Sequence, residues 1–146
     1  MDRSKMKAIK VSAKDCVGCE ICGITCSVTH GDEPRASAMR IRIKRRYPDL
    51  PTPTFQPMVC QNCEKPKCIE ACPREALVLD QEVQQVLLTE SKCDGCGKCV
   101  EACPFHAIWV DPLRNVAIKC DLCNSNPVCV RYCSFGAIRS PSEAGA

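Results

Sequence analysis

Residues 93–104 read Cys-Asp-Gly-Cys-Gly-Lys-Cys-Val-Glu-Ala-Cys-Pro, a C-x2-C-x2-C-x3-C-P run. Three closely spaced thiolates of this kind can bind three corners of one cubane [4Fe–4S] cluster. The fourth, Cys103, is expected to follow a short helix and to point towards a second cluster. Pro104 cannot continue a helix, so it returns the chain to an extended segment. We therefore expect this run to organise the fold around metal.

Three further groups of cysteines vary the same pattern. The first is Cys16-x2-Cys19-x2-Cys22-x3-Cys26, followed by Ser27 where the run above has proline. The second is Cys60-x2-Cys63-x4-Cys68-x3-Cys72-Pro73, and the last is Cys120-x2-Cys123-x5-Cys129-x3-Cys133. Together with Cys93, Cys96, Cys99 and Cys103 they account for all 16 cysteines. The count predicts four [4Fe–4S] clusters with sixteen metal ligands, and no catalytic residue.

The composition agrees with a chain held together by metal. Aromatic residues make up only 4% of the 146 residues, which is little material for a hydrophobic core at this length. The N-terminal segment contains no apolar signal-peptide core, and no apolar stretch reaches the roughly 18 residues of a membrane span. We therefore expect a cytoplasmic protein with reduced thiols and no direct membrane insertion. Four clusters of about −2 each would bring the formal +3 to about −5, so part of the Lys and Arg offsets buried cluster charge, which disfavours a nucleic-acid partner.

An internal repeat follows the last cysteine of groups two, three and four. It reads Pro73-Arg-Glu-Ala-Leu77, Pro104-Phe-His-Ala-Ile108 and Ser134-Phe-Gly-Ala-Ile138. A small alanine at a fixed offset, followed by an aliphatic residue, predicts a tight seat against a cluster before a strand begins. Alternation predicts a strand at 6–14 and two hairpins, formed by 75–79 with 85–89 and by 107–110 with 116–119.

The longest cysteine-free segment spans residues 27–59. Residues 39–46 alternate as a strand with one basic face, and residues 47–57 carry four prolines, which predicts an extended connector. We expect a solvated edge strand whose charge discourages edge-to-edge pairing, with docking of an acidic partner as the alternative. Because the sixteen cysteines already supply four ligands to each of four clusters, His30 and His106 are expected to be bystanders rather than metal ligands. Asp15, Asp94 and Asp121 are expected to be solvated loop carboxylates.

Zinc is the alternative metal, because zinc sites also take four cysteines. Such sites usually pair two C-x2-C knuckles across a longer loop, whereas three close cysteines and a fourth after three residues suit a cube better. A zinc-stabilised interaction module would be colourless. An iron–sulfur sensor would need a DNA-binding or output domain, for which no residues remain.

The fourth cysteine of each group is expected to cross to a partner cluster. Groups two and three are separated by 20 residues holding one hairpin, a good spacer, whereas groups one and two are separated by 33 mostly irregular residues. Nested pairing, two with three and one with four, is therefore favoured. Tandem pairing is the alternative, because groups three and four also have an acceptable spacer. The nested sets are Cys60, Cys63, Cys68, Cys103 and Cys93, Cys96, Cys99, Cys72 (inner), and Cys16, Cys19, Cys22, Cys133 and Cys120, Cys123, Cys129, Cys26 (outer).

The expected fold is α+β, small and loop-rich, with short β-hairpins and short helices. We expect a single compact polyferredoxin domain over residues 1–146, made of two nested ferredoxin-like units that each bind two [4Fe–4S] clusters. The outer unit would comprise 6–35 with 111–140, and the inner unit 55–110. Residues 36–54 would form the basic strand and the proline-rich connector.

Several motifs together resemble one family. They are Cys26-Ser-Val-Thr-His30, Cys60-Gln-Asn-Cys63, Pro66-Lys-Cys68, Ala71-Cys-Pro73, Cys103-Pro-Phe105, Lys119-Cys-Asp-Leu-Cys123 and Pro127-Val-Cys129. The family comprises the four-cluster electron-transfer subunits of formate dehydrogenases, formate hydrogenlyase, DMSO and nitrate reductases, carbon monoxide dehydrogenase and some tungsten aldehyde oxidoreductases. The resemblance covers roughly residues 8–139 and also favours nested pairing. Ser134 departs from the proline expected after the last cysteine, which affects local loop geometry.

The resemblance implies a non-catalytic electron-transfer subunit of an oxidoreductase complex in anaerobic metabolism. Its expected partners are a cytoplasmic tungsten- or molybdenum-pterin oxidoreductase of aldehyde or formate type, and ferredoxin, a flavin subunit or a hydrogenase. The sequence shows no general-base constellation and no nucleophile other than the cysteines, which agrees with an electron relay. Alternatives are a free polyferredoxin or an electron-transfer subunit of a hydrogenase or carbon monoxide dehydrogenase. Clusters near both ends would also let copies self-associate into a longer wire.

Overall fold

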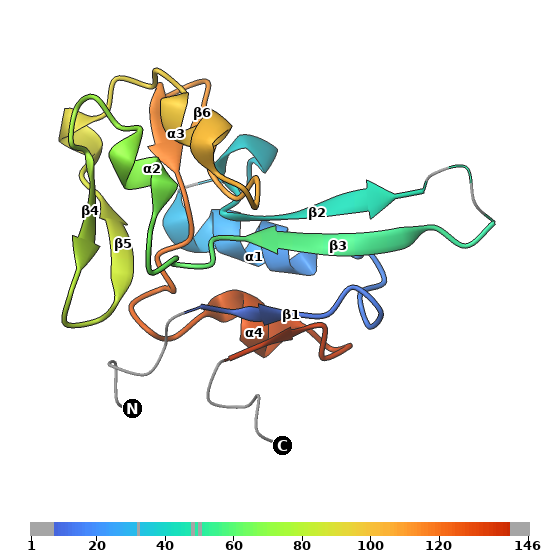
Figure 1. Cartoon of the computed structure of the whole chain (residues 1–146). Helices are drawn as coiled ribbons and strands as arrows, with labels where there is room; N and C mark the ends of the chain where they lie inside the picture. Colours follow the sequence, from blue (N-terminus) through green and yellow to red (C-terminus); the bar gives the residue numbers. More distant parts are fainter. Residues whose placement is uncertain (1–7, 32, 48, 50, 141–146) are drawn as a thin grey trace.

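The computed structural model of the chain describes residues 8–31, 33–47, 49 and 51–140 (Figure 1). Its helices are α1 Ile21–His30, α2 Lys67–Glu70, α3 Lys98–Ala102 and α4 Val128–Tyr132, with single 3-10 turns at Ala36–Ala38 and Glu90–Lys92. Its strands are β1 Lys10–Val11, β2 Ile41–Arg46, β3 Thr54–Val59, β4 Leu77–Asp80, β5 Gln85–Leu88, β6 Trp109–Asp111, β7 Val116–Ile118 and β8 Ile138–Arg139. The fold is therefore small and loop-rich, with short helices and short strands.

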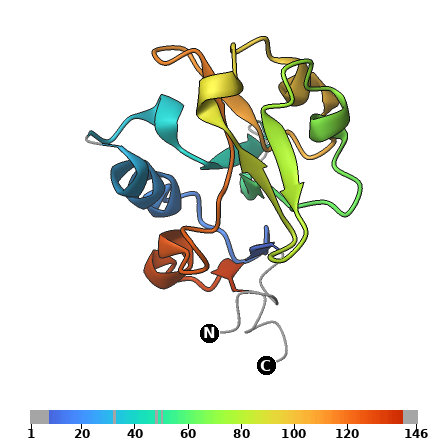
Figure 2. The ribbon, with the colours of Figure 1, turned by 90° about the vertical axis from the view of Figure 1, so that its left-hand side faces the viewer.

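The described strands form four separate antiparallel pairs (Figure 1). Three are hairpins between consecutive strands: β2–β3, β4–β5 and β6–β7. The fourth pairs β1 with β8, so that Val11 lies opposite Ile138. Helices α1 and α4 pack against each other beside this pair (Figure 2). The first and the last cysteine group are therefore neighbours in space.

Both predicted hairpins are confirmed, with Leu77 opposite Leu88 and Trp109 opposite Ile118. The strand predicted at 39–46 is confirmed as β2, but the segment after it is more than a connector, because its last residues begin β3. Pro57 lies within β3, where the missing N–H is tolerated because each strand of a two-stranded pair has a free edge. Of the first predicted strand, Lys10–Val11 is observed, and residues 6 and 7 lie outside the described residues.

Helix α1, the longest of the described helices at 10 residues, has two different faces. Cys22 and Cys26 lie one turn apart and are buried. Ile21, Ile24 and Val28 are 41, 46 and 54% exposed. The helix therefore turns two thiols inward and presents an apolar stripe outward. None of the described helices is long and apolar enough to cross a membrane.

The basic face of β2 is solvated only in its second half, so that prediction is wrong for Arg40 and Arg42. Arg40, directly before the strand, forms an ion pair with Asp121 at 2.7 Å. The guanidinium of Arg42 lies over the ring of Trp109, 4.3 Å from its centroid. Residues 44–46 are exposed, because the second half of β2 belongs to a hairpin that projects from the body (Figure 1). Only this projecting half is a free basic surface among the described residues of the strand.

The repeat after the last three cysteine groups is a repeated turn. The residue before each alanine has a positive φ, with values of 49, 49 and 64° at Glu75, His106 and Gly136. The alanines are almost fully buried, with exposures of 1, 0 and 2% at Ala76, Ala107 and Ala137. The aliphatic residues that follow are buried as well: Leu77, Ile108 and Ile138. The tight alanine seat predicted before a strand is therefore confirmed in its conformation and burial.

The hydrophobic core is small and is shared with cysteine side chains. One buried cluster combines Ile9, Ile41, Val59, Leu122 and Ile138 with Cys22, Cys26, Cys60, Cys120 and Cys129. A second combines Leu77, Val86, Ile108 and Ala117 with Cys68 and Cys99. Because aliphatic residues surround thiols in both clusters, the centre of the molecule is built around its cysteines.

Candidate metal centres

Each cysteine group begins with the same backbone turn. The residue before the second cysteine has a positive φ in all four groups, with values of 74, 44, 70 and 57° at Gly18, Asn62, Gly95 and Leu122. Glycine and asparagine adopt this left-handed region readily, whereas a leucine does so at a cost. The turn brings backbone N–H groups towards thiols: the N–H of Asn62 lies 3.5 Å from Cys60 Sγ, and that of Leu122 lies 3.4 Å from Cys120 Sγ.

A short helix then carries the third cysteine of each group. Helices α2, α3 and α4 hold Cys68, Cys99 and Cys129, all buried, and each ends at or before the fourth cysteine. Cys103 and Cys133 have extended backbone at the ends of their helices, which directs the fourth thiol away from the other three. Helix α1 differs, because it continues through Cys26 to His30.

Backbone N–H groups also donate to thiols at the ends of the groups. The N–H groups of Ala76 and Ala107 each lie 3.4 Å from the Sγ atoms of Cys72 and Cys103. Burial raises the pKa of Cys72, but its backbone donors outweigh burial and hold the pKa below its ordinary value. The alanine seat therefore places a donor beside the fourth thiol, where it stabilises negative charge on sulfur.

Three hollows of the molecule are each lined by four thiols. We call them the Cys19 set (Cys16, Cys19, Cys22, Cys133), the Cys26 set (Cys26, Cys120, Cys123, Cys129) and the Cys96 set (Cys72, Cys93, Cys96, Cys99). The other four cysteines form the Cys60 set (Cys60, Cys63, Cys68, Cys103). Within it, burial raises the pKa of Cys63 and Cys68, and Cys60 and Cys103 add to the rise in both. Each set combines three thiols of one group with the last thiol of another.

The four sets are also neighbours of one another. Burial raises the pKa of Cys129, and the thiol of Cys22, from the Cys19 set, contributes to that rise. Burial likewise raises the pKa of Cys120 to about 12, and Cys60 contributes to it. Cys68 and Cys99 share one buried cluster. The Cys19 set therefore adjoins the Cys26 set, the Cys26 set adjoins the Cys60 set, and the Cys60 set adjoins the Cys96 set.

The donor chemistry of these sets fits [4Fe–4S] clusters. All sixteen cysteines are free thiols. Burial raises the pKa of Cys22 to about 12 and the pKa of Cys99 to about 11, because packed thiols in an apolar interior ionise only with a compensating cation. Iron supplies that charge, and thiolate is the ligand of the cubane. The assignment of the sixteen thiols to iron stays a prediction.

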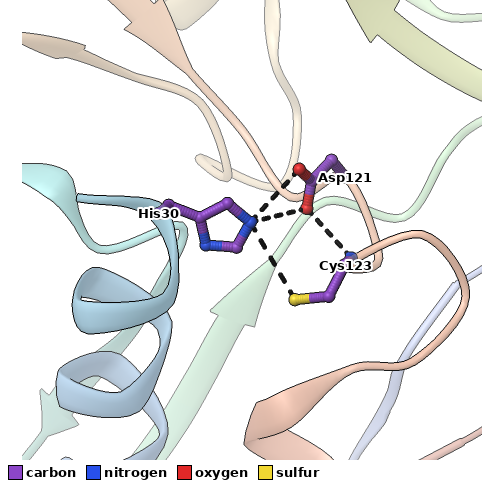
Figure 3. A group of neighbouring side chains, drawn as sticks. All are labelled: His30, Asp121 and Cys123. Atoms are coloured by element: carbon purple, nitrogen blue, oxygen red, sulfur yellow. Dashed lines mark hydrogen bonds and ion pairs between the residues drawn. The ribbon is translucent and has the colours of Figure 1, made fainter.

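His30 connects α1 to the last cysteine group (Figure 3). Its Nδ1 lies 2.8 Å from the backbone oxygen of Cys26, and its Nε2 lies 3.0 Å from Asp121 Oδ1. The same two nitrogens lie 3.8 Å from Cys26 Sγ and 3.9 Å from Cys123 Sγ. The hydrogen bond to Asp121 is the main cause that raises the pKa of His30 to about 12. His30, expected to be a bystander rather than a ligand, is therefore hydrogen-bonded beside the Cys26 set, and Asp121, expected to be a solvated loop carboxylate, is instead paired with His30.

The carboxylate of Asp121 forms ion pairs with two side chains, His30 and Arg40. Burial alone would raise its pKa, but His30 and Arg40 outweigh burial and hold the pKa of the carboxyl below its usual range. His30, Asp121 and Cys123 also offer ligand atoms within 4.8 Å of one another. The guanidinium of Arg40, 2.7 Å from Asp121, disfavours a separate metal cation at this point. We therefore interpret the three residues as a hydrogen-bonded group beside the Cys26 set.

Lys119 is a second charged residue at the centre of the molecule that sequence reasoning missed. It is 4% exposed, and its Nζ donates to the backbone oxygens of Val86 and Cys120, the latter at 2.7 Å. Its charge opposes the rise in pKa of Cys120 and also of Cys63 and Cys68. Lys119 therefore lies between the Cys26 set and the Cys60 set. A lysine at the end of the apolar strand 116–118 is the signal that could have found it.

The chain was compared with known proteins. The family model of the 4Fe-4S dicluster domain matches residues 52–143. The chain is 35% identical over 125 residues to the polyferredoxin-like subunit of aliphatic sulfonate oxidoreductase from Pyrococcus furiosus, covering 86% of this chain and 70% of that relative. It is 33% identical over 138 residues to the thiosulfate reductase electron transfer subunit PhsB of Salmonella typhi, with coverages of 86 and 70%. These matches confirm the resemblance to iron–sulfur electron-transfer subunits.

A longer relative is matched over part of its length only. The chain is 32% identical over 129 residues to the NADH-dependent phenylglyoxylate dehydrogenase subunit beta of Aromatoleum evansii. The match covers 88% of this chain but 29% of that relative. The similarity is therefore confined to one part of that relative, and this part corresponds to most of the present chain.

Proposed function

The chain belongs to the family with the 4Fe-4S dicluster domain, and from this premise we propose that it is a non-catalytic electron-transfer subunit that holds four [4Fe–4S] clusters. The observation that carries the proposal is the division of sixteen free thiols into four sets of four. When bound, each cluster accepts and releases a single electron. The chain supplies the ligands, the backbone N–H donors and the apolar surroundings that set the potentials.

We propose that the nested pairing describes the ligands, so that each of the four sets holds one cluster. The order of neighbouring sets supports a row: Cys19 set, Cys26 set, Cys60 set, Cys96 set. Cys19 and Cys96, one in each terminal set, are the exposed cysteines among the sixteen, all of which lie in the described part of the chain. The two ends of the row are thus the places where electrons enter and leave.

The partner is proposed to be a tungsten- or molybdenum-pterin oxidoreductase of aldehyde or formate type. At the other end of the row, ferredoxin, a flavin subunit or a hydrogenase would exchange electrons. Relatives named as subunits of aliphatic sulfonate oxidoreductase and thiosulfate reductase support an oxidoreductase partner in general. A cytoplasmic location is part of this proposal, because a reducing compartment keeps thiols available for iron. Purification of the native protein, followed by metal analysis of what accompanies it, tests the partner: a complex without tungsten or molybdenum would refute it.

Iron and acid-labile sulfide assays after anaerobic reconstitution test the clusters. We expect about sixteen atoms of each per chain and a broad brown absorbance that dithionite bleaches. A colourless protein that retains zinc would support the interaction module instead.

A double variant separates nested from tandem pairing. Nested pairing assigns Cys68 and Cys103 to one cluster, whereas tandem pairing assigns them to two. We therefore expect Cys68→Ala with Cys103→Ala to lose about four iron atoms, no more than Cys68→Ala alone. Loss of about eight iron atoms in the double variant would support tandem pairing.

End-to-end association of copies is a second candidate, favoured by the distribution of charge. Residues 8–59 carry eight Lys/Arg and five Asp/Glu, and residues 60–110 carry five and eight. The basic and acidic parts of two copies would attract each other at low salt. Light scattering should then give a mass that rises with concentration and falls when salt is added. A monomer mass at every concentration would contradict it.

A further inference from the structure

The cationic side chains near the cysteines are distributed unequally among the four sets. The hollow of the Cys26 set is lined by His30 and Arg40 as well as by Asp121. Buried Lys119 donates to the backbone oxygen of Cys120, a member of this set, at 2.7 Å. Three cationic side chains and one carboxylate therefore surround this set. Its surroundings carry an excess of positive charge.

The imidazole of His30 is held as a cation by its geometry. Both of its ring nitrogens face acceptor oxygens, that of Cys26 at 2.8 Å and that of Asp121 at 3.0 Å. Each nitrogen therefore carries a hydrogen, and the ring is an imidazolium. It lies between two thiols of the set, Cys26 and Cys123, as Figure 3 shows for the latter. Asp121 fixes the ring, and Arg40 shares the charge of the carboxylate.

The other sets lack this arrangement. The charged residue that lines the hollow of the Cys19 set is Glu20, an anion. At the Cys96 set, Arg74 and Asp94 pair with each other at 2.8 Å and are solvent-exposed, so their charges cancel and are screened. The Cys60 set shares Lys119, whose charge acts on Cys63 and Cys68. Positive charge is thus greatest at the Cys26 set and second at the Cys60 set.

We propose that the cluster held by Cys26, Cys120, Cys123 and Cys129 is the most easily reduced of the four, and that His30 and Lys119 make it so. Reduction adds one negative charge to a cluster, and fixed cations and N–H donors beside its sulfurs lower the cost of that charge. This inference rests on the proposed function. An electron on the row would then reside preferentially on the cluster of the Cys26 set, the second set counted from the Cys19 end.

Redox titrations monitored by electron paramagnetic resonance test the proposal on the reconstituted full chain. We expect His30→Leu to shift the highest of the midpoint potentials downward and to leave the others in place. Lys119→Met should lower the two highest, because Lys119 faces two sets. Lys44→Met and Arg45→Met are matched controls, since both residues are exposed on the projecting half of β2; they should leave every midpoint unchanged.

Iron and sulfide content is measured on every sample, so that loading and potential are separated. Should His30→Leu bind less iron than the wild type, Arg40→Met replaces it, because Arg40 pairs with Asp121 at 2.7 Å. A smaller downward shift of the highest midpoint is then expected. Unchanged midpoints in variants with full iron, or equal shifts in the control variants, would overturn the proposal. A wild-type chain with far fewer than about sixteen iron atoms would overturn the proposed function instead.

Discussion

The surroundings of Cys19 and those of Cys96 differ, although both cysteines are exposed and both belong to a C-x2-C turn. Around Cys19 lie large apolar side chains, among them Val17, Tyr132 and Phe135 at 48, 56 and 53% exposure. Around Cys96 lies the exposed ion pair of Arg74 with Asp94. One end of the molecule is apolar and the other is polar. Surfaces of such different chemistry are suited to different partners.

The two ends also differ in the charge of the segments near them. The hairpin β2–β3 contacts the Cys19 end, where a Cβ atom on Gly18 would meet the ring of Phe55 at 2.5 Å. Its exposed residues 44–46 are all basic. The part of the chain from 60 to 110, which carries Cys96, has three more acidic than basic residues. The comparison shows that one repeated cysteine motif lies beside an exposed basic hairpin at Cys19 and within a net acidic segment at Cys96.

The largest effect is expected from removing the exposed cysteine, a proposed ligand, at one end. Cys19→Ser should lose about four iron atoms and slow electron exchange with an anionic metal complex, which the basic end attracts. Cys96→Ser should lose as much iron but slow exchange with a cationic complex. Stopped-flow kinetics with both complexes gives the four rates. Equal slowing by both variants with both complexes would break the distinction between the ends.

Reversing charge without touching a ligand should have an intermediate effect. Replacing Lys44, Arg45 and Arg46 by glutamate should slow exchange with the anionic complex about tenfold or more at low salt, and the difference should shrink as salt screens the charges. Lysine at Glu70, Glu75 and Glu101, which are exposed on the acidic part, is the matched change and should slow exchange with the cationic complex. A loss of exchange rate that does not depend on salt would show that residues 44–46 of the β2–β3 hairpin do not act through charge.

The smallest effect is expected from adding one methyl group to the equivalent turn at each end. Gly18 and Gly95 have φ values of 74 and 70°, so alanine is strained by about 1–2 kcal/mol at both. At Gly18 the new Cβ would meet the side chain of Phe55, which can move, whereas at Gly95 it would meet the backbone oxygen of Asn115. Gly95→Ala should therefore lower the denaturant midpoint of the loaded protein more than Gly18→Ala. Anaerobic unfolding followed by visible absorbance measures the order, and a reversed order would contradict it.

The elements next to the cysteine groups could be predicted because their signals are local. The alanine repeat and the two hairpins depend on residues a few positions apart, such as Ala107 and Ile108. Strand β3 was missed because Pro57 argues against a strand, and only pairing with β2 shows that it is tolerated.

The charged group beside the cysteines was missed for a different reason. His30 follows Cys26 by one helical turn, which does place both on one face of α1. Its partner Asp121 is 91 residues away, and no periodicity connects them. The sequence did indicate that some Lys and Arg would balance buried negative charge. Which cations do so, Lys119 and Arg40 among them, depends on contacts that only the folded chain brings together.

The pairing of β1 with β8 has a consequence for biosynthesis. Val11 leaves the ribosome more than a hundred residues before its partner Ile138, so this contact must wait for the end of translation. Every other strand pair in the described part of the chain joins two consecutive strands in a hairpin. A nascent chain that ends at residue 110 can therefore complete the β2–β3 and β4–β5 hairpins while Cys16, Cys19 and Cys22 remain without Cys133. These thiols are synthesised first and wait longest for Cys133, so they are exposed to oxygen and to other metal ions for the longest time. Protecting them is therefore the most demanding step of maturation.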